Sequence, residues 1–272
     1  MRAADLEAAA EVTGAAFSKD LSEPVVARRW RERIVHPWRS DPGGAFVAEL
    51  DGQVIGVAEA IVRERLWCLS MLAVQPGVQS AGVGRALMAR GVRYGRAADS
   101  GLIVSSNDPR ALRLYADYGF ALHPTFEASG VVDRRRAPAL GGRVHEDDGD
   151  DLEAFAALTR EIRGAPYTEE LRFALTQGTR LLRIADRGFA AVTSEGQLWA
   201  LVARDEEAAS ELLWSALALA EGPARVRWIT GAQQWAIDIV ARAGLRLVAY
   251  GALCVRGRPG PLRPFLPSSP FA

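Results

Sequence analysis

The sequence is poor in cysteine and almost devoid of lysine. It has 2 cysteines in 272 residues, Cys68 and Cys254, and both lie in apolar, strand-like surroundings. Two cysteines are too few for a disulfide framework, so we expect buried free thiols in an intracellular protein. Lys19 is the only lysine, and 33 basic residues balance 33 acidic ones. A formal net charge of zero excludes a global field that would draw the protein to nucleic acid or to an anionic membrane.

Long apolar runs are also missing. No run approaches the length that a membrane-spanning helix needs. The N-terminal stretch carries Asp5, Glu7 and Glu11 among alanines, which is typical of a helix and not of a signal peptide. We therefore expect a cytoplasmic protein whose length fits two domains of ordinary size.

The most informative segment follows an apolar run that ends with Leu72, Ala73 and Val74. Gly82 and Gly84 come next, and a helical apolar pattern begins directly after them. Such a strand–turn–helix directs free backbone N–H groups and the positive end of the helix dipole at one place, which suits a phosphate. Glycine matters there because a side chain would keep the backbone away from a bulky anion.

Two common phosphate motifs do not fit this segment. The Walker pattern is absent because no Gly-Lys-Ser/Thr follows, and the dinucleotide fingerprint lacks its first glycine. What remains is Gln79-x-x-Gly82-x-Gly84, which resembles the pyrophosphate-binding loop of the GNAT superfamily of N-acetyltransferases. On the residues alone, a purely steric role of the two glycines stays an alternative.

A second segment downstream strengthens the resemblance. Asn107, Tyr115 and Gly119 stand in the order and at the spacing common among GNAT members. Asp108 is a good helix N-cap and Gly119 a good helix end, so a short helix is predicted between them. The resemblance covers residues 1–133 well. It implies an α/β (α+β) fold with a mixed, mostly antiparallel central sheet flanked by helices.

The resemblance also implies acetyl-CoA as co-substrate and no metal. It assigns acetyl-CoA to Leu72, Ala73, Val74, Gln79, Ser80, Ala81, Gly82, Val83, Gly84, Arg85, Asn107 and Tyr115. Tyr115 would be the general acid, since a phenol of pKa near 10 can protonate a thiolate of pKa near 8.5. Without the resemblance, the alternatives are a core aromatic residue for Tyr115 and a solvated helix arginine for Arg85.

The general base is less clear. Histone-type members carry a strand glutamate eleven residues before the loop glutamine, and this position is Cys68 here. Glu59 and Glu64 on the preceding strand are the candidate bases, with His36 as a further one. Taking the proton from an ordinary alkylamine at pH 7 costs roughly 4.6 kcal/mol. We therefore predict a weakly basic acceptor, such as an amino sugar, a hydrazine or an aryl amine.

The acceptor pocket is predicted mainly from aromatic residues. Its expected lining is Trp30, His36, Trp38, Trp67 and Cys68. The proline-rich residues 259–272 are either a disordered end or a segment that wraps back over the first domain. The arginines of residues 28–33 read as a solvated helix face, with an acidic substrate group or a phosphate as the alternative partner.

The two halves of the chain repeat one pattern at an offset of 125 residues, with Gly244 in the place of Gly119. We predict a catalytic GNAT domain at 1–133, a linker at 134–150 and a degenerate GNAT-like domain at 151–272. Acidic residues at 205–207 replace the glycine loop, and they would oppose a pyrophosphate. Predicted strands lie at 45–50, 53–63, 66–74, 102–105, 120–132, 181–185, 189–193 and 198–203, and helices at 3–17, 23–35, 85–98, 109–118, 152–162 and 168–175.

The leading hypothesis is a small-molecule N-acetyltransferase that works as a monomer or homodimer, without nucleic acid or membrane partners. Three alternatives stay open: a tandem acetyltransferase of thiol biosynthesis, a protein N-acetyltransferase, and a non-catalytic acyl-CoA sensor. A sensor has no need of a proton donor such as Tyr115. A Tyr115→Phe change that lowers turnover while acetyl-CoA still binds would therefore favour an enzyme.

Overall fold

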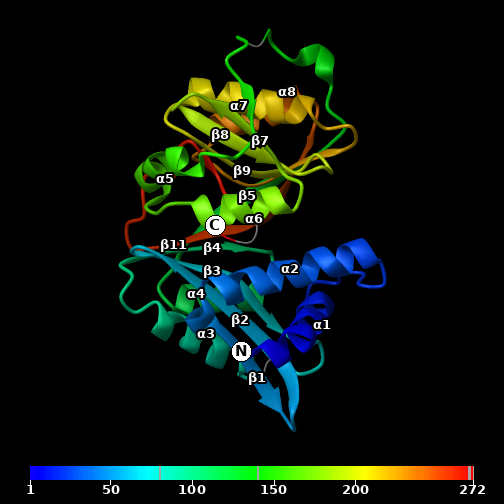
Figure 1. The fold of residues 1–272 in the computed structure, drawn as a ribbon, viewed down its shortest axis with the longest axis vertical. Coiled ribbons are helices and arrows are strands. Elements are labelled where there is room, and N and C mark those ends of the chain that lie inside the picture. The colour runs from blue at the N-terminus through cyan, green and yellow to red at the C-terminus, as the bar shows by residue number, and fades with distance from the viewer. Residues whose placement is uncertain (80, 140, 269–270, 272) are drawn as a thin grey trace. The chain divides into compact units, whose positions relative to one another are not determined.

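The computed structural model describes residues 1–79, 81–139, 141–268 and 271. These residues form two compact units, one made of residues 1–99 with Phe271 and the other of residues 100–268. Both units have sheets flanked by helices, as the predicted α/β fold class requires (Figure 1). The predicted boundaries at 133 and 150 follow the sequence repeat, not compactness, and they remain predictions.

The first unit is built on three antiparallel strands, β1 (Ala45–Leu50), β2 (Gln53–Arg63) and β3 (Leu66–Val74). They match the predicted strands residue for residue. Asp51 and Gly52 join β1 to β2 with positive φ values of 50° and 77°, the conformation that favours an Asp-Gly hairpin turn. The predicted hairpin is thus confirmed.

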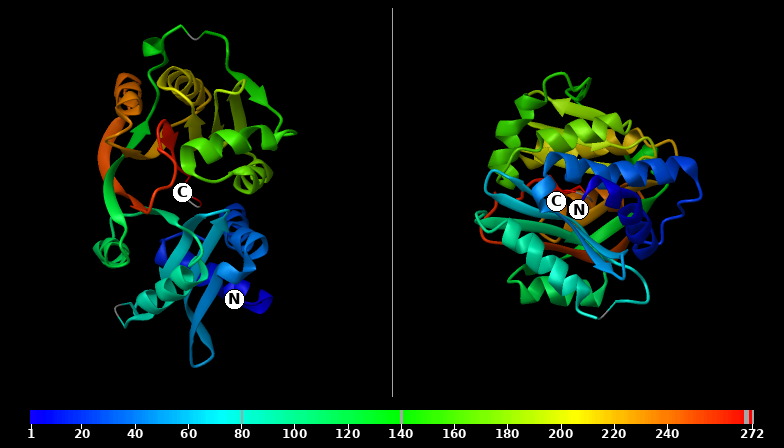
Figure 2. Two further views of the ribbon diagram at one scale, coloured as in Figure 1. Left: turned by 90° about the vertical axis from the view of Figure 1, so that its left-hand side faces the viewer. Right: turned by 60° about the horizontal axis from the view of Figure 1, so that its bottom comes forward.

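Helices cover both faces of this sheet. Figure 2 shows α1 (Leu6–Ala16) and α2 (Pro24–Ser40) on one face and α3 (Val83–Tyr94) on the other. Ile34 of α2 and Val57 of β2 belong to the apolar cluster on the first face. On the second face Gly91 of α3 lies against Ala60 and Trp67. Because side chains alternate along a strand, Glu59 faces α1 and α2, as Val57 does. Short 3-10 helices, η1 (Ala3–Asp5) and η2 (Pro42–Gly44), complete the unit.

Asp41 ties the end of α2 to the rest of the first unit. Its carboxylate accepts hydrogen bonds from the Tyr94 hydroxyl of α3 and from the Val62 amide of β2. It is only 8% exposed. We expect Tyr94→Phe to lower the free energy of unfolding by about 1–3 kcal/mol, because one oxygen of a buried carboxylate loses its partner. Urea denaturation measures this loss, and an unchanged midpoint would show that the bond contributes nothing.

The second unit contains the remaining elements. They are β4 (Ser100–Ser105), α4 (Pro109–Asp117), β5 (Ala121–Gly130), η3 (Arg134–Arg136), β6 (His145–Asp147), η4 (Leu152–Phe155), α5 (Ala156–Arg163), α6 (Thr168–Thr176), β7 (Arg180–Ile184), β8 (Gly188–Val192), β9 (Leu198–Ala203), α7 (Glu206–Ala218), β10 (Ala224–Thr230), α8 (Gln234–Arg242), β11 (Arg246–Arg256) and β12 (Phe265–Leu266).

The sequence repeat appears in the backbone of this unit. Gly119 ends α4 with a φ of 80°, and Gly244 follows α8 with a φ of 82°. The next amide bonds back to the helix in both places, Phe120 to the carbonyl of Tyr115 at 3.1 Å and Leu245 to that of Val240 at 3.0 Å. The two helix ends are therefore the same structure, 125 residues apart, as the sequence offset predicts.

The terminal strands of the two repeats are exchanged. Four strands of the second unit run in the order β4-β11-β5-β10, and each pairs antiparallel with its neighbour. β11, the last long strand of the second repeat, thus pairs with β4 of the first repeat. In turn β5, the last strand of the first repeat, pairs with β10 of the second. The repeats share one sheet here, a feature that the sequence analysis did not predict.

A second sheet has the order β12-β9-β8-β7-β6, and α7 packs on it in the main apolar core (Figure 1). Two of its strands were not predicted. β6 lies within the segment taken as a linker, and its sequence His-Glu-Asp has no apolar alternation. β12 lies in the proline-rich tail, where Phe265 and Leu266 are buried against β9. Residues 264–268 are therefore packed, not a disordered end.

Candidate active site

The glycine loop leaves the start of α3 open. Gly82 is the N-cap residue with a φ of 84°, and no side chain caps the helix. No atom lies within 4 Å of the place that a β-carbon at Gly82 would take. The amides of the first helical turn, beginning at Val83 and Gly84, have no partner within the helix. An open helix N-terminus of this kind fits a diphosphate.

The other predicted loop residues lie around this helix start. Arg85 is exposed in the first turn of α3, and Gln79 donates a hydrogen bond to the Val74 carbonyl at 3.2 Å. This bond holds the loop against the end of β3, which Leu72 and Ala73 also form. Ala81 is exposed, and Ser80 lies outside the described residues.

The matching helix start in the second repeat is closed. The Asp205 carboxylate caps α7 and accepts a hydrogen bond from the Ala208 amide at 2.9 Å. Glu207 forms ion pairs with Arg143 and Arg187. Negative side chains thus fill the place where an anion would bind. This arrangement supports the prediction that the second repeat does not bind acetyl-CoA.

Asn107 and Tyr115 lie in the second unit, on either side of the start of α4. The side-chain oxygen of Asn107 accepts a hydrogen bond from the Gly251 amide of β11. Tyr115 is 6% exposed, and burial raises the pKa of its phenol above the ordinary value. Tyr115 therefore keeps its proton at neutral pH, and it gives this proton up less readily than a free phenol of pKa near 10 would.

Two residues predicted to line the acceptor pocket lie in the core. Trp67 is fully buried, and its indole N–H donates to the Gly91 carbonyl of α3 at 2.9 Å. Cys68 is 1% exposed. Trp67 therefore packs between the sheet and α3, on the face away from α1 and α2. This differs from the expectation that the indole contacts the acceptor.

The other predicted lining residues belong to α2. Trp30 donates its indole N–H to the Thr13 hydroxyl of α1 at 3.0 Å, and Trp38 donates to the Met1 carbonyl at 3.4 Å. Both residues are half-buried. The His36 ring instead meets the ring of Phe271, with the centroids 5.3 Å apart.

The structure separates the two candidate bases. Glu64 is exposed in the turn between β2 and β3, with a φ of 54°. Glu59 is fully buried, and neither of its carboxylate oxygens has a hydrogen-bond partner. Burial raises the pKa of Glu59 from its ordinary value of 4.5 to about 8, although the nearby Arg33 charge opposes this shift. Of the two, only Glu59 resembles a general base for neutral pH.

Arg33 lies beside Glu59 and is not part of a solvated face. Its side chain is 15% exposed, and Nη1 lies 3.9 Å from Oε2 of Glu59. Burial lowers the pKa of Arg33 to about 10. The guanidinium also donates to the hydroxyl and the carbonyl of Ser70. The pairing of β2 with β3 shifts register here, and Ser70 is the residue left over in the bulge. Arg33 thus binds the hydroxyl and the carbonyl of the bulge residue.

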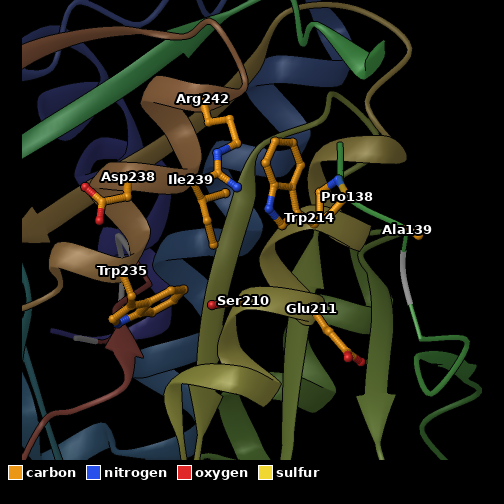
Figure 3. Close-up of a pocket in the computed structure, with 9 residues that line it drawn as sticks. All are labelled: Pro138, Ala139, Ser210, Glu211, Trp214, Trp235, Asp238, Ile239 and Arg242. Carbon is orange, nitrogen blue, oxygen red and sulfur yellow. The ribbon is translucent and has the colours of Figure 1, made fainter. Parts of the chain in front are cut away.

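A separate cavity of about 340 Å³ lies between α7 and α8 (Figure 3). Trp214, Trp235 and Arg242 are among its lining residues. None of the residues predicted for acetyl-CoA or for the acceptor lines it. Two carboxylates line it: Glu211 accepts two hydrogen bonds from Arg143, and Asp238 accepts one from the Gln234 side chain.

Comparisons with known proteins give the class of this site. Residues 7–120 match the sequence model of the acetyltransferase (GNAT) family, so this segment of the chain belongs to that family. The match includes the glycine loop, Glu59 and Tyr115. The matched segment is therefore similar to acetyltransferases of the GNAT type.

The chain is similar to particular proteins in sequence and in structure. Mycothiol acetyltransferase of Streptomyces avermitilis is 33% identical over 120 residues, which make up 42% of this chain and 39% of that relative. A putative acetyltransferase from Pyrococcus horikoshii superposes with a TM-score of 0.80 at 16% identity, over 99% of this chain and 93% of its own. A tandem GNAT protein from the clavulanic acid biosynthesis pathway gives a TM-score of 0.55 at 14% identity, over 84% and 87%. The two likenesses show the fold, and the second of these proteins is described as a tandem GNAT protein.

No group of three or more His, Cys, Asp or Glu side chains that could hold a metal ion occurs among the described residues. Within the same residues, no helix combines the length and the apolar character that crossing a membrane requires.

Proposed function

We propose that the protein transfers the acetyl group of acetyl-CoA to the amine of a small molecule, with Glu59 as the general base. One observation carries this proposal. Glu59 is a buried carboxylate without a hydrogen-bond partner, and its pKa is raised to about 8. Burying a carboxylate without a hydrogen-bond partner lowers the stability of the fold. A pKa close to the working pH is what amine deprotonation requires.

The proposed reaction uses three parts of the chain. The open start of α3 at Gly82 binds the diphosphate of acetyl-CoA. The amine nitrogen forms a bond to the acetyl carbon while the carbon–sulfur bond breaks, and the amine proton passes to Glu59. By resemblance to the family, Tyr115 gives its proton to the departing thiolate.

Glu59 changes the expected acceptor. The sequence led us to a weakly basic amine because no glutamate occupies position 68. A carboxylate of pKa about 8 can take a proton from an alkylammonium ion with a smaller penalty than water can. We therefore propose primary amines in general as acceptors, alkylamines included.

A panel of acceptors tests this proposal. Free-thiol release from acetyl-CoA would be followed with primary alkylamines, amino sugars, hydrazines and aryl amines, each with a control that lacks the acceptor. Thiol release that depends on the amine, with the matching acetamide found by mass spectrometry, is the expected result. Thiol release that no amine in the panel changes would contradict the proposal.

A thiol-biosynthesis acetyltransferase is the second candidate. The 33% identity to the Streptomyces avermitilis mycothiol acetyltransferase favours it. Both candidates transfer an acetyl group, and they differ in the acceptor. Adding the unacetylated precursor of mycothiol to the panel separates them. A kcat/KM for this precursor at least a hundredfold above those of all simple amines would favour the second candidate.

Gly84 provides a direct test of the diphosphate site. A β-carbon at Gly84 would meet no atom closer than 3.7 Å, so a side chain fits without disturbing the helix. We expect Gly84→Glu to raise the Kd for acetyl-CoA about tenfold or more, since a like charge near the diphosphate costs roughly 1–4 kcal/mol. Gly84→Ala is the matched control, and it should leave the Kd within about threefold. Calorimetry measures both, and equal effects of the two changes would contradict the assignment.

A further inference from the structure

Phe271 lies against Arg33, the residue that is next to the proposed base. It belongs to the first unit, and its ring is fully buried. The ring meets His36 edge-on, with the centroids 5.3 Å apart and an interplanar angle of 74°. The guanidinium carbon of Arg33 lies 5.6 Å from the centroid of the same ring.

Arg33 and His36 make this position selective for a flat ring. They lie one turn apart on α2, so their side chains project from the same side of the helix. A guanidinium over a ring face and an imidazole edge against it are both arrangements that attract a π system. An aliphatic group of equal size would gain the apolar contact but not these electrostatic contributions.

The same guanidinium links this ring position to Glu59. Arg33 lies 3.9 Å from the Glu59 carboxylate, and it also holds the carbonyl of Ser70 in the bulge of β3. Neither oxygen of Glu59 is reached by solvent in this arrangement. A base must meet its substrate, so part of the surrounding packing has to move before an amine can contact Glu59. Phe271 lies over the Arg33 guanidinium on one side of this packing.

We propose that Arg33 and His36 form a subsite for the aromatic group of an arylalkyl amine, and that Phe271 occupies this subsite while no acceptor is bound. The inference rests on the proposed function and specifies its substrate class. An acceptor whose ring replaces the ring of Phe271 brings its amine toward Glu59. Phe271 then competes with the acceptor and sets the affinity that an amine must exceed.

Kinetics of Phe271→Ala test the competition. We expect the KM for benzylamine and phenethylamine to fall at least fivefold, because the internal competitor is gone. The KM for propylamine, which has no ring, should stay within about twofold. Phe271→Leu keeps much of the side-chain volume but removes the flat ring. Its KM should therefore differ from that of wild type for arylalkyl amines more than for propylamine. Leu50→Ala, which removes an exposed side chain from the β1–β2 hairpin of the same unit, is the control without effect.

A binding measurement separates this inference from the proposed function. 4-Fluorophenylalanine placed at position 271 reports the surroundings of the ring by fluorine NMR, whether or not acetyl transfer occurs. Benzylamine should move this signal to its solvent-exposed position, and propylamine should not. A shift of the signal without any acetylation would contradict the proposed transferase activity and support the subsite. Acetylation of benzylamine without signal movement, or a KM that rises for all amines in Phe271→Ala, would overturn the subsite.

Discussion

Replacing Glu59 with glutamine is expected to lower kcat for acetyl transfer by about 10²- to 10⁴-fold, the usual contribution of a general base. The Kd for acetyl-CoA should stay within about twofold, because the residues assigned to the diphosphate begin at the loop before α3. Glutamine keeps the size of the side chain and removes only its proton-accepting carboxylate. Steady-state kinetics at pH 8 together with calorimetry of acetyl-CoA binding measure the two effects.

The pH profile gives the same prediction a second readout. Burial raises the pKa of Glu59 to about 8, and only the deprotonated form can accept a proton. The kcat/KM of the wild type should therefore rise about tenfold per pH unit below pH 8 and level off above it. An aryl amine is the right substrate, because it is unprotonated across this range and adds no titration of its own. The Glu59→Gln variant should lack this rise.

Two controls keep a loss of activity from being confused with unfolding. Glu64→Gln changes the exposed carboxylate of the same hairpin, and its kcat should stay within about twofold. Since the folded pKa of Glu59 lies above the ordinary value of 4.5, its ionisation opposes folding as the pH rises from about 4.5 to about 8. Glu59→Gln should lack this penalty and be no less stable than wild type at pH 8. A Glu59→Gln variant with the wild-type profile would show that the base is another group.

The local elements of the first unit were largely readable from the sequence. β1, β2 and β3 alternate or run continuously apolar, and the Asp51-Gly52 turn fixes their register. The glycine loop could also be predicted from the sequence. A positive φ favours glycine, as at Gly82, and no capping side chain precedes α3. By contrast, α2 runs past its predicted end and through Pro37, since its packing decides its length.

The surroundings of Glu59 could not be read in this way. A bulge at Ser70 has no sequence signal, and it decides which face of β3 each side chain takes. Arg33 looked like one of several solvated arginines, although the bulge carbonyl and Glu59 draw it inward. Trp67 looked like a pocket aromatic because aromatic residues are common in pockets. Its face was set instead by the small residue Gly91 of α3.

The exchange of strands between the two repeats could not be predicted from the sequence for a different reason. β5 and β11 are corresponding strands of the two repeats, and β11 instead of β5 is the neighbour of β4 in the shared sheet. The choice depends on long-range contacts that no local pattern encodes. The structure shows that β11 pairs with β4 over the register Ala252–Ser105 to Arg256–Gly101. Gly251 stands directly before this pairing.

Gly251→Ala is expected to destabilise the protein by about 3 kcal/mol or more, through left-handed strain combined with overpacking. Gly251 has a φ of 61°, and a β-carbon there would overlap with the carbonyl oxygen of Ser105. Its amide also donates to the Asn107 side chain, so a shift of β11 would break that bond too. Urea denaturation measures the change, with an expected fall of about 1 M or more in the midpoint.

Gly119→Ala is the matched control for this change. Gly119 has a φ of 80° in the same unit, but no atom lies within 4 Å of its β-carbon position. Alanine there should cost only the conformational strain, about 1–2 kcal/mol. The difference between the two variants then isolates the close approach of β11 to β4. A larger loss at Gly251 would show that the close approach of β11 to β4 requires glycine at this position. Equal losses would mean that the two strands move apart at little cost and that the exchanged strand does not depend on glycine.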